Sequence, residues 1–222
     1  MLATRVRTAR GRSNASARWL QRQLNDPYVA KAQAAGYRSR AAFKLIELDD
    51  RFKFLKPGGL VVDLGAAPGG WTQVAAERCA GGKVLGLDIQ DIDPMPGADV
   101  MTLDIYAEDA IERIEAAMDG RRPTVVLSDM APSTTGHKKT DQLRIGALAD
   151  AAFDVARQLL APDGVFVVKI FQGGAPQELL TALKRDFREV RHAKPPASRA
   201  DSSEMYLVAI GFRGRAAADA DA

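Results

Sequence analysis

The chain has 222 residues, of which 46% are hydrophobic, and its formal net charge is +3. This length suits one α/β domain with short extensions, and no apolar run approaches the roughly 18 residues that suggest a membrane span. The single cysteine, Cys79, excludes an internal disulfide bond and fits a reducing compartment.

The amino-terminal quarter of the chain is basic. Residues 1–56 hold 13 Lys and Arg against 4 Asp and Glu, whereas the remainder is net acidic. This asymmetry favours a polyanionic partner, with nucleic acid first, although a solvated charged arm is the alternative. The first 25 residues contain six arginines and no acid, which is also typical of a mitochondrial transit peptide.

Strand and helix patterns alternate after this arm. A helix is expected after Ser39, a plausible N-cap, and "KPGG" (56–59) ends it. Strands are then expected over 60–65, 83–88, 98–104, 124–129, 164–170, 189–193 and 205–212, and helices over 70–79, 107–118, 140–160 and 176–186. This βαβ rhythm predicts a mostly parallel, seven-stranded sheet with helices on both faces. Such folds bind ligands at the carboxyl ends of their strands.

A glycine-rich turn follows the first strand in "VVDLGAAPGGW", residues 61–71. Glycines allow close approach of the backbone to a ligand, and the following helix start offers free N–H groups, so a nucleotide is the candidate. The dinucleotide pattern G-x-G-x-x-G fails because Ala67 occupies the second glycine position after Gly65. Asp88 and Asp104 follow the next two strands, where each alone is also explained as a helix N-cap or surface charge.

A lysine lies within the apolar strand "GVFVVKI". Burying an unpaired ammonium is costly, so Lys169 needs a partner or loses its proton. Asp129 ends the neighbouring strand, about 4.8 Å away, and the two side chains can converge at the carboxyl edge. Glu204 precedes the last strand, and Lys44 lies on the helix before the sheet. A purely structural ion-pair cluster is the alternative interpretation of these four residues.

Five strings carry a specific resemblance. They are D-x-G-x-x-P-G-G-W after the first strand, "SRAAFKL", "SDMAP", "FVVKIFQG" and "SSEMYLVA". Together they resemble the FtsJ-type ribose 2′-O-methyltransferases, and most of all the bacterial enzymes that methylate a uridine in 23S ribosomal RNA. The resemblance runs from Ser16 to Phe212 and implies a Rossmann-like class I S-adenosylmethionine-dependent methyltransferase fold.

The resemblance also implies roles for individual residues. The residues expected to bind S-adenosylmethionine are Gly69, Trp71, Asp88, Asp104 and Asp129, with Asp63 bracing the turn. The residues expected to act in catalysis are Lys44, Asp129, Lys169 and Glu204. Lys169 is then the proton acceptor, oriented by Asp129. Because lysine is normally protonated at neutral pH, a second role stays open, in which charged Lys169 steers the lone pair of the ribose hydroxyl.

The implied partner is 23S ribosomal RNA or the large ribosomal subunit. We accordingly divide the chain into a basic arm that contacts RNA or the ribosome (1–35), a catalytic domain (36–212) and a disordered tail (213–222). Trp19 and Tyr28 of the arm would stack on a base or pack on the body, and a second basic run, 184–199, would flank the same cleft.

Further expectations concern the setting of the reaction. We expect a monomer in the bacterial cytoplasm, with a mitochondrial origin still open, no membrane partner and no structural metal. Three alternatives remain. They are a ribose methyltransferase for transfer RNA or another RNA, an NAD-dependent oxidoreductase, and a non-catalytic RNA-binding or assembly protein.

Overall fold

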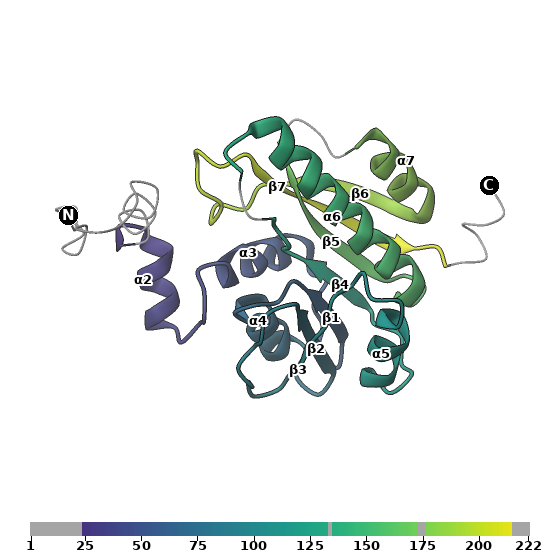
Figure 1. Cartoon of the computed structure of the whole chain (residues 1–222). Coiled ribbons are helices and arrows are strands. Elements are labelled where there is room, and N and C mark those ends of the chain that lie inside the picture. Colours follow the sequence, from purple (N-terminus) through teal and green to yellow (C-terminus); the bar gives the residue numbers. More distant parts are fainter. Residues whose placement is uncertain (1–23, 133–134, 173–175, 215–222) are drawn as a thin grey trace.

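The computed structural model describes residues 24–132, 135–172 and 176–214, and its centre is one sheet of seven strands. The strands are β1 (Leu60–Leu64), β2 (Lys83–Asp88), β3 (Asp99–Thr102), β4 (Val125–Ser128), β5 (Val165–Phe171), β6 (Phe187–Ala193) and β7 (Glu204–Phe212). Their order across the sheet is β3-β2-β1-β4-β5-β7-β6 (Figure 1). Strands β1 to β5 pair in parallel, and β7 is antiparallel to both β5 and β6. The mostly parallel sheet predicted from the sequence is therefore confirmed.

Helices cover both faces of this sheet. The described helices are α2 (Pro27–Ala34), α3 (Ala42–Phe52), α4 (Gly70–Arg78), α5 (Ala110–Ala117), α6 (Lys138–Leu159) and α7 (Gln177–Asp186). Helices α3 and α4 pack on one face, and α5, α6 and α7 on the other (Figure 1). Within the described ranges, no helix combines the length and apolar character that crossing a membrane would require.

Strand β1 illustrates how the sequence produces two cores. Successive side chains of a strand point to opposite faces of the sheet. Val61 accordingly lies in the core beneath α3 and α4, together with Leu45 and Trp71, whereas Val62 lies in the core that contains Phe153 of α6. Because both faces are covered, the central strands are continuous apolar runs instead of alternating patterns.

The amino end of α3 differs from the prediction. Ser39 was expected to cap it, but the helix begins at Ala42 with Ala41 in the N-cap position and no side-chain cap. The Ser39 hydroxyl instead lies against α4, where a Cβ added to Gly70 would stand 2.2 Å from Ser39 Oγ. Packing between the two helix starts thus overrides the local capping preference.

Helix α2 was not predicted, although the sequence carries a helix-start signature there. Asp26 occupies the N-cap and its Oδ1 accepts a hydrogen bond from the backbone N–H of Tyr28 at 3.0 Å, and Pro27 is the first helical residue. The Tyr28 ring packs on Phe43 of α3 with centroids 5.6 Å apart. Part of the expected arm is therefore packed against the body of the protein.

Candidate functional site

The register of the sheet determines which residue lies beside Lys169. Ser128, the last residue of β4, pairs with Val168 of β5, so the next residues, Asp129 and Lys169, lie side by side. Lys169 is 6% exposed, and its Nζ stands 3.0 Å from Asp129 Oδ1 and donates to the backbone oxygen of Asp129. The buried ammonium is thus paired at the carboxyl edge of the sheet.

The other two expected catalytic residues join this pair. Lys44 projects from the buried face of α3, and its Nζ lies 2.7 Å from Glu204 Oε1 and 3.7 Å from Asp129 Oδ2. Amines and carboxylates alternate in the order Lys169, Asp129, Lys44, Glu204. The structure therefore brings together four side chains from α3, β5, β7 and the segment after β4, which we call the tetrad.

Two residues of this site were missed in the sequence. The Tyr206 hydroxyl lies 2.7 Å from Asp129 Oδ1 and 3.0 Å from Glu204 Oε1, and the Ser198 hydroxyl donates to Glu204 Oε1 at 3.0 Å. Tyr206 could have been predicted from its spacing, because residues two apart on a strand share a face and Tyr206 is two residues after Glu204. Ser198 comes from the loop between β6 and β7 and had no such signal.

The charges within the site offset one another. Burial disfavours the ionised form of Asp129, but the adjacent Lys169 and Lys44, with a hydrogen bond from Tyr206, hold its pKa below the ordinary value. Burial, followed by the negative charges of Asp129 and Glu204, raises the pKa of Tyr206 well above 10. The phenol is therefore neutral, and its single O–H proton is shared between two carboxylates, with Asp129 Oδ1 the nearer acceptor.

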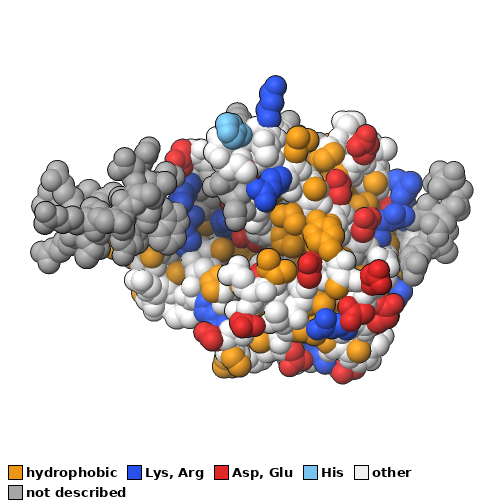
Figure 2. All heavy atoms as spheres, viewed as in Figure 1, with side chains coloured by type: hydrophobic (Ala, Val, Ile, Leu, Met, Phe, Trp, Pro, Cys, Tyr) orange, Lys and Arg blue, Asp and Glu red, His pale blue; other side chains and the backbone are white. Residues whose placement is uncertain are grey.

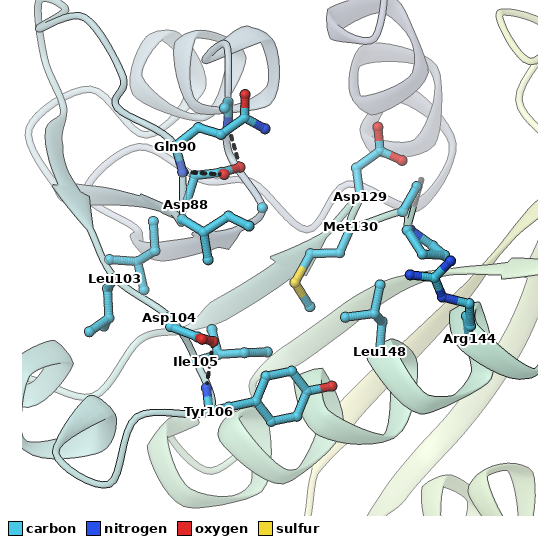
Figure 3. A pocket seen from close by; sticks show the side chains of 16 residues that line it. Asp88, Gln90, Leu103, Asp104, Ile105, Tyr106, Asp129, Met130, Arg144 and Leu148 are labelled. Carbon is cyan, nitrogen blue, oxygen red and sulfur yellow. Dashed lines mark hydrogen bonds between the residues drawn. The ribbon is translucent and has the colours of Figure 1, made fainter. Parts of the chain in front are cut away.

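A cavity of about 650 Å³ adjoins the tetrad at the ends of β1 to β4 (Figure 3). The sixteen residues lining it are Gly65, Ala67, Leu87, Asp88, Ile89, Gln90, Leu103, Asp104, Ile105, Tyr106, Asp129, Met130, Ala131, Pro132, Arg144 and Leu148. Asp88 and Asp104 lie on one side and Asp129 on the other (Figure 3). Figure 2 shows the corresponding hollow, with hydrophobic side chains on its floor and Lys or Arg side chains along its upper rim.

Three of the five expected cofactor residues line this cavity, and two of these also shape the local backbone. Asp88 accepts hydrogen bonds from the N–H groups of Ala67 and Gln90 at 3.0 and 2.9 Å, which fixes the turn after β1. Asp104 accepts from the N–H of Tyr106 at 3.0 Å. These bonds leave acceptor capacity on both carboxylates, so a structural role and a binding role are compatible.

Gly69 and Trp71 do not line the cavity. The Trp71 ring packs against Tyr206 with centroids 5.5 Å apart, and its Nε1 donates to the carbonyl oxygen of Ala41 at 2.8 Å. Gly69 has φ 109°, and a Cβ there would stand 2.5 Å from Met95 Cε and 3.1 Å from the Arg38 side chain. Gly69 therefore shapes the turn, and Trp71 packs against Tyr206, which contacts the tetrad.

Asp63 is buried beneath the same turn. It is 1% exposed, its Oδ2 accepts from Thr72 Oγ1 at 2.7 Å, and its Oδ1 has no hydrogen-bond partner in the described part of the chain. Burial raises its pKa to about 7, and the negative charges of Asp129 and Asp88 add to this against the hydrogen bond from Thr72.

Other expected elements are distributed as follows. Trp19 lies outside the described residues, and so does most of the expected tail. Tyr28 packs on the body, and its hydroxyl donates to Glu47 at 3.0 Å.

The second basic run, residues 184–199, does not flank the cleft as a whole, because Arg188 pairs with Asp163, which precedes β5 at the opposite edge of the sheet. In the described ranges, no three His, Cys, Asp or Glu side chains are grouped so as to hold a metal ion.

Comparison with known proteins gives consistent results. Residues 37–212 match the family model described as FtsJ-like methyltransferase. The chain is 54% identical to the Ribosomal RNA large subunit methyltransferase E of Parvibaculum lavamentivorans, with 99% of this chain and 91% of the relative covered. It is 57% identical to the protein of the same name from Paramagnetospirillum magneticum, with 96% and 89% covered. The crystal structure of a ribosomal RNA methyltransferase from Plasmodium falciparum superposes with a TM-score of 0.72 at 32% identity, covering 81% of this chain and all of that one.

Proposed function

Because the chain belongs to the FtsJ-like methyltransferase family, we propose that it methylates the 2′-hydroxyl of a uridine ribose in the 23S ribosomal RNA of the large subunit. S-adenosylmethionine is the methyl donor of this family. The observation that carries the proposal is the tetrad of two amines and two carboxylates beside a cavity at the carboxyl edge of the sheet.

The cavity suits this methyl donor. Its volume of about 650 Å³ exceeds what a nucleoside with an amino-acid side chain requires, and its lining combines apolar side chains with separated carboxylates. We propose that Asp88 accepts hydrogen bonds from the ribose hydroxyls of the cofactor and Asp104 from the adenine amino group. Gly69 and Trp71, which the family assigns to the methionine end, would contribute through the backbone of the turn.

The bound cofactor supplies an electrophilic methyl group, and the chain supplies alignment and a path for the proton. We assign Lys169 as the acceptor of the hydroxyl proton, Asp129 as the group that orients it, and Lys44 and Glu204 as the groups that hold the ribose. Burial of the tetrad supports this assignment, because charged groups act more strongly in a site shielded from water.

The alternative role of Lys169 is separable by kinetics. A single-turnover rate that rises with pH supports deprotonation of a base. A rate that does not change between about pH 6 and about pH 10 supports the other role, in which charged Lys169 orients the hydroxyl.

The substrate is tested by transfer of a tritiated methyl group. We expect the purified chain to label large ribosomal subunits from cells that lack it, and mass spectrometry to place the label on one uridine ribose of 23S ribosomal RNA. Transfer RNA, small subunits and naked 23S ribosomal RNA serve as the comparison substrates. Labelling of transfer RNA in preference to large subunits would contradict the proposed substrate.

The remaining proposals concern the organisation of the chain. We propose that residues 1–35 contact ribosomal RNA, since the amino-terminal 25 residues carry six arginines and no acid. Residues 36–212 would form the catalytic domain. We propose a cytoplasmic enzyme, in keeping with its bacterial relatives, and a monomer.

A further inference from the structure

Three groups of different origin lie within hydrogen-bond distance of one oxygen of Glu204. Lys44 contacts Oε1 at 2.7 Å, and the hydroxyls of Tyr206 and Ser198 lie 3.0 Å from the same atom. Lys44 and Tyr206 belong to α3 and β7, which form the core of the fold. Ser198 alone belongs to a loop, the connection between β6 and β7, and it is nevertheless 7% exposed.

The turn that carries Ser198 is attached to α3 and the segment before it. The Ala197 N–H donates to Glu47 Oε2 at 2.6 Å, and its carbonyl oxygen accepts from the guanidinium of Arg40. Ala197 is completely buried. The backbone on the amino side of Ser198 is therefore fixed by two polar contacts, which orients its hydroxyl toward Glu204.

The other side of Ser198 is attached to the arm. Arg199 Nε lies 3.1 Å from Asp26 Oδ2, and the same oxygen is 2.9 Å from Arg40 Nε, an ion pair without hydrogen-bond geometry at that nitrogen. Asp26 Oδ1 meanwhile caps α2. One buried carboxylate thus joins the arm helix, the start of α3 and the loop that carries Ser198.

We propose that Ser198 is a positioning residue for Glu204 and that Asp26, through Arg199, holds Ser198 in place. This inference rests on the proposed function, in which Glu204 holds the target ribose. The terminal torsion of a glutamate is broad and roughly two-fold, so the direction of its carboxylate depends on its donors. The arm helix is then part of the catalytic apparatus, because it fixes the loop that aims a catalytic carboxylate.

The first test is Ser198→Ala, assayed on large subunits from cells that lack the chain. We expect kcat to fall about tenfold, as for loss of one hydrogen bond to a charged group that aligns the substrate. The KM for large subunits, the Kd for S-adenosylmethionine and the thermal unfolding midpoint stay near their original values. Ser198→Thr restores the hydroxyl and with it most of the rate.

Ser202→Ala is the matched control. Ser202 lies on the same loop, and its hydroxyl accepts from the backbone N–H of Glu204 at 3.1 Å instead of donating to the carboxylate. A fall of kcat in Ser202→Ala equal to that in Ser198→Ala would overturn the inference, because loop integrity would then explain both. So would wild-type kcat in Ser198→Ala.

The second test is Asp26→Asn. Asparagine is an equally good N-cap, so α2 keeps its cap while both arginines lose the charge of their partner. We expect a several-fold lower kcat, and little further loss when Asp26→Asn is combined with Ser198→Ala, because both changes act through one contact. Strictly additive effects would overturn the link through Arg199. Asp50→Asn, whose carboxylate pairs with Arg78 and Lys53, is the control.

Glu204→Gln separates this inference from the proposed function. If Glu204→Gln retains wild-type kcat, the assigned role of Glu204 and the positioning role of Ser198 both fail. If Glu204→Gln is inactive and Ser198→Ala is fully active, the role of Glu204 stands and only the inference about Ser198 fails.

Discussion

At the scale of single residues, the site consists of ionisable groups whose burial is possible only because each is paired with another. Lys169, Asp129, Lys44 and Glu204 each carry a charge opposite to that of a neighbour, and the neutral Tyr206 hydroxyl lies between the two carboxylates. Removing one partner from such a buried set leaves the others unpaired, which costs more than the lost contact alone. Variants at this site therefore need a stability measurement alongside the activity.

Lys169→Ala tests the proposed proton acceptor. We expect the single-turnover rate to fall by roughly 10²- to 10⁴-fold, the usual contribution of general acid–base catalysis. Because Lys169 does not line the cavity, the Kd for S-adenosylmethionine should change little. Isothermal titration and single-turnover assays measure both, with the exposed Lys184→Ala as control. Near-normal turnover would remove Lys169 from the mechanism.

The buried carboxyl group of Asp63 predicts how the stability of the protein depends on pH. Its pKa is about 7 in the folded chain, against an ordinary value of 3.8. Between these values the folded state holds a proton that the unfolded state has lost. The free energy of unfolding therefore falls as pH rises through this window, by an amount on the order of 4 kcal/mol.

Asp63→Asn keeps an acceptor for the Thr72 hydroxyl and cannot ionise. Its stability relative to the original protein should therefore increase as pH rises from about 4 to about 7. Urea unfolding at several pH values measures this difference. Parallel pH dependences for the two proteins would show that Asp63 does not titrate in this range.

At the scale of elements, the site depends on the close approach of the turn after β1 to the segment after β4. Gly65 has φ 75°, and a Cβ there would lie 2.3 Å from Met130 Cγ. Gly65 and Met130 both line the cavity, and Asp129 precedes Met130 directly. The glycine is thus required by its backbone conformation and by the packing that joins the cavity to the tetrad.

Gly65→Ala should therefore lower both stability and cofactor affinity. The left-handed backbone alone costs about 1–2 kcal/mol, and displacement of Met130 adds to it. Gly81→Ala is the matched control, because Gly81 has φ 82° and no atom within 4 Å of an added Cβ. The loss of unfolding free energy in Gly65→Ala minus the loss in Gly81→Ala gives the contribution of packing against Met130. Equal losses in the two variants would contradict a role for the Gly65–Met130 contact.

At the scale of the whole molecule, α2 and the edge of the sheet that carries the tetrad are joined by contacts between distant segments. Asp26 and Tyr28 attach α2 to α3 and to the loop before β7, which also carries Ser198. Helix α2, which the arginine-rich segment precedes in the sequence, is therefore linked to the loop that contacts the tetrad. We therefore propose that the arginine-rich segment contacts RNA that enters the site.

Deletion of residues 2–22 tests the arm. It removes six arginines and leaves Asp26 and α2 intact. We expect weaker binding to large subunits and a shallower dependence of affinity on salt, by up to roughly 0.7–0.9 in log–log slope for each lost phosphate contact. Filter binding at several salt concentrations measures this, and thermal unfolding checks the fold. An unchanged salt dependence would exclude the deleted arginines from RNA contact.

The sequence by itself determined much of this protein. Hydrophobic periodicity can be recognised in short segments of sequence, and it predicted the alternation of strands and helices and a core on both faces of the sheet. The parallel arrangement of the strands then indicated their carboxyl ends as the place to look for a site. Sequence strings around Lys44, Asp129, Lys169 and Glu204 were distinctive enough to indicate the reaction through a family resemblance. The prediction of Ser39 as the N-cap of α3 was wrong, because packing of Ser39 against α4 outweighed the local preference of serine for capping.

Only the tertiary structure decided which distant segments support the tetrad. Asp26 and Arg199 are 173 residues apart, and neither periodicity nor spacing links them. The same holds for Ser198, whose contact with Glu204 depends on how a loop packs against α3 and the arm helix. Such contacts are set by loop closure and by burial against other elements, which are properties of the assembled fold and leave no pattern in a short stretch of sequence.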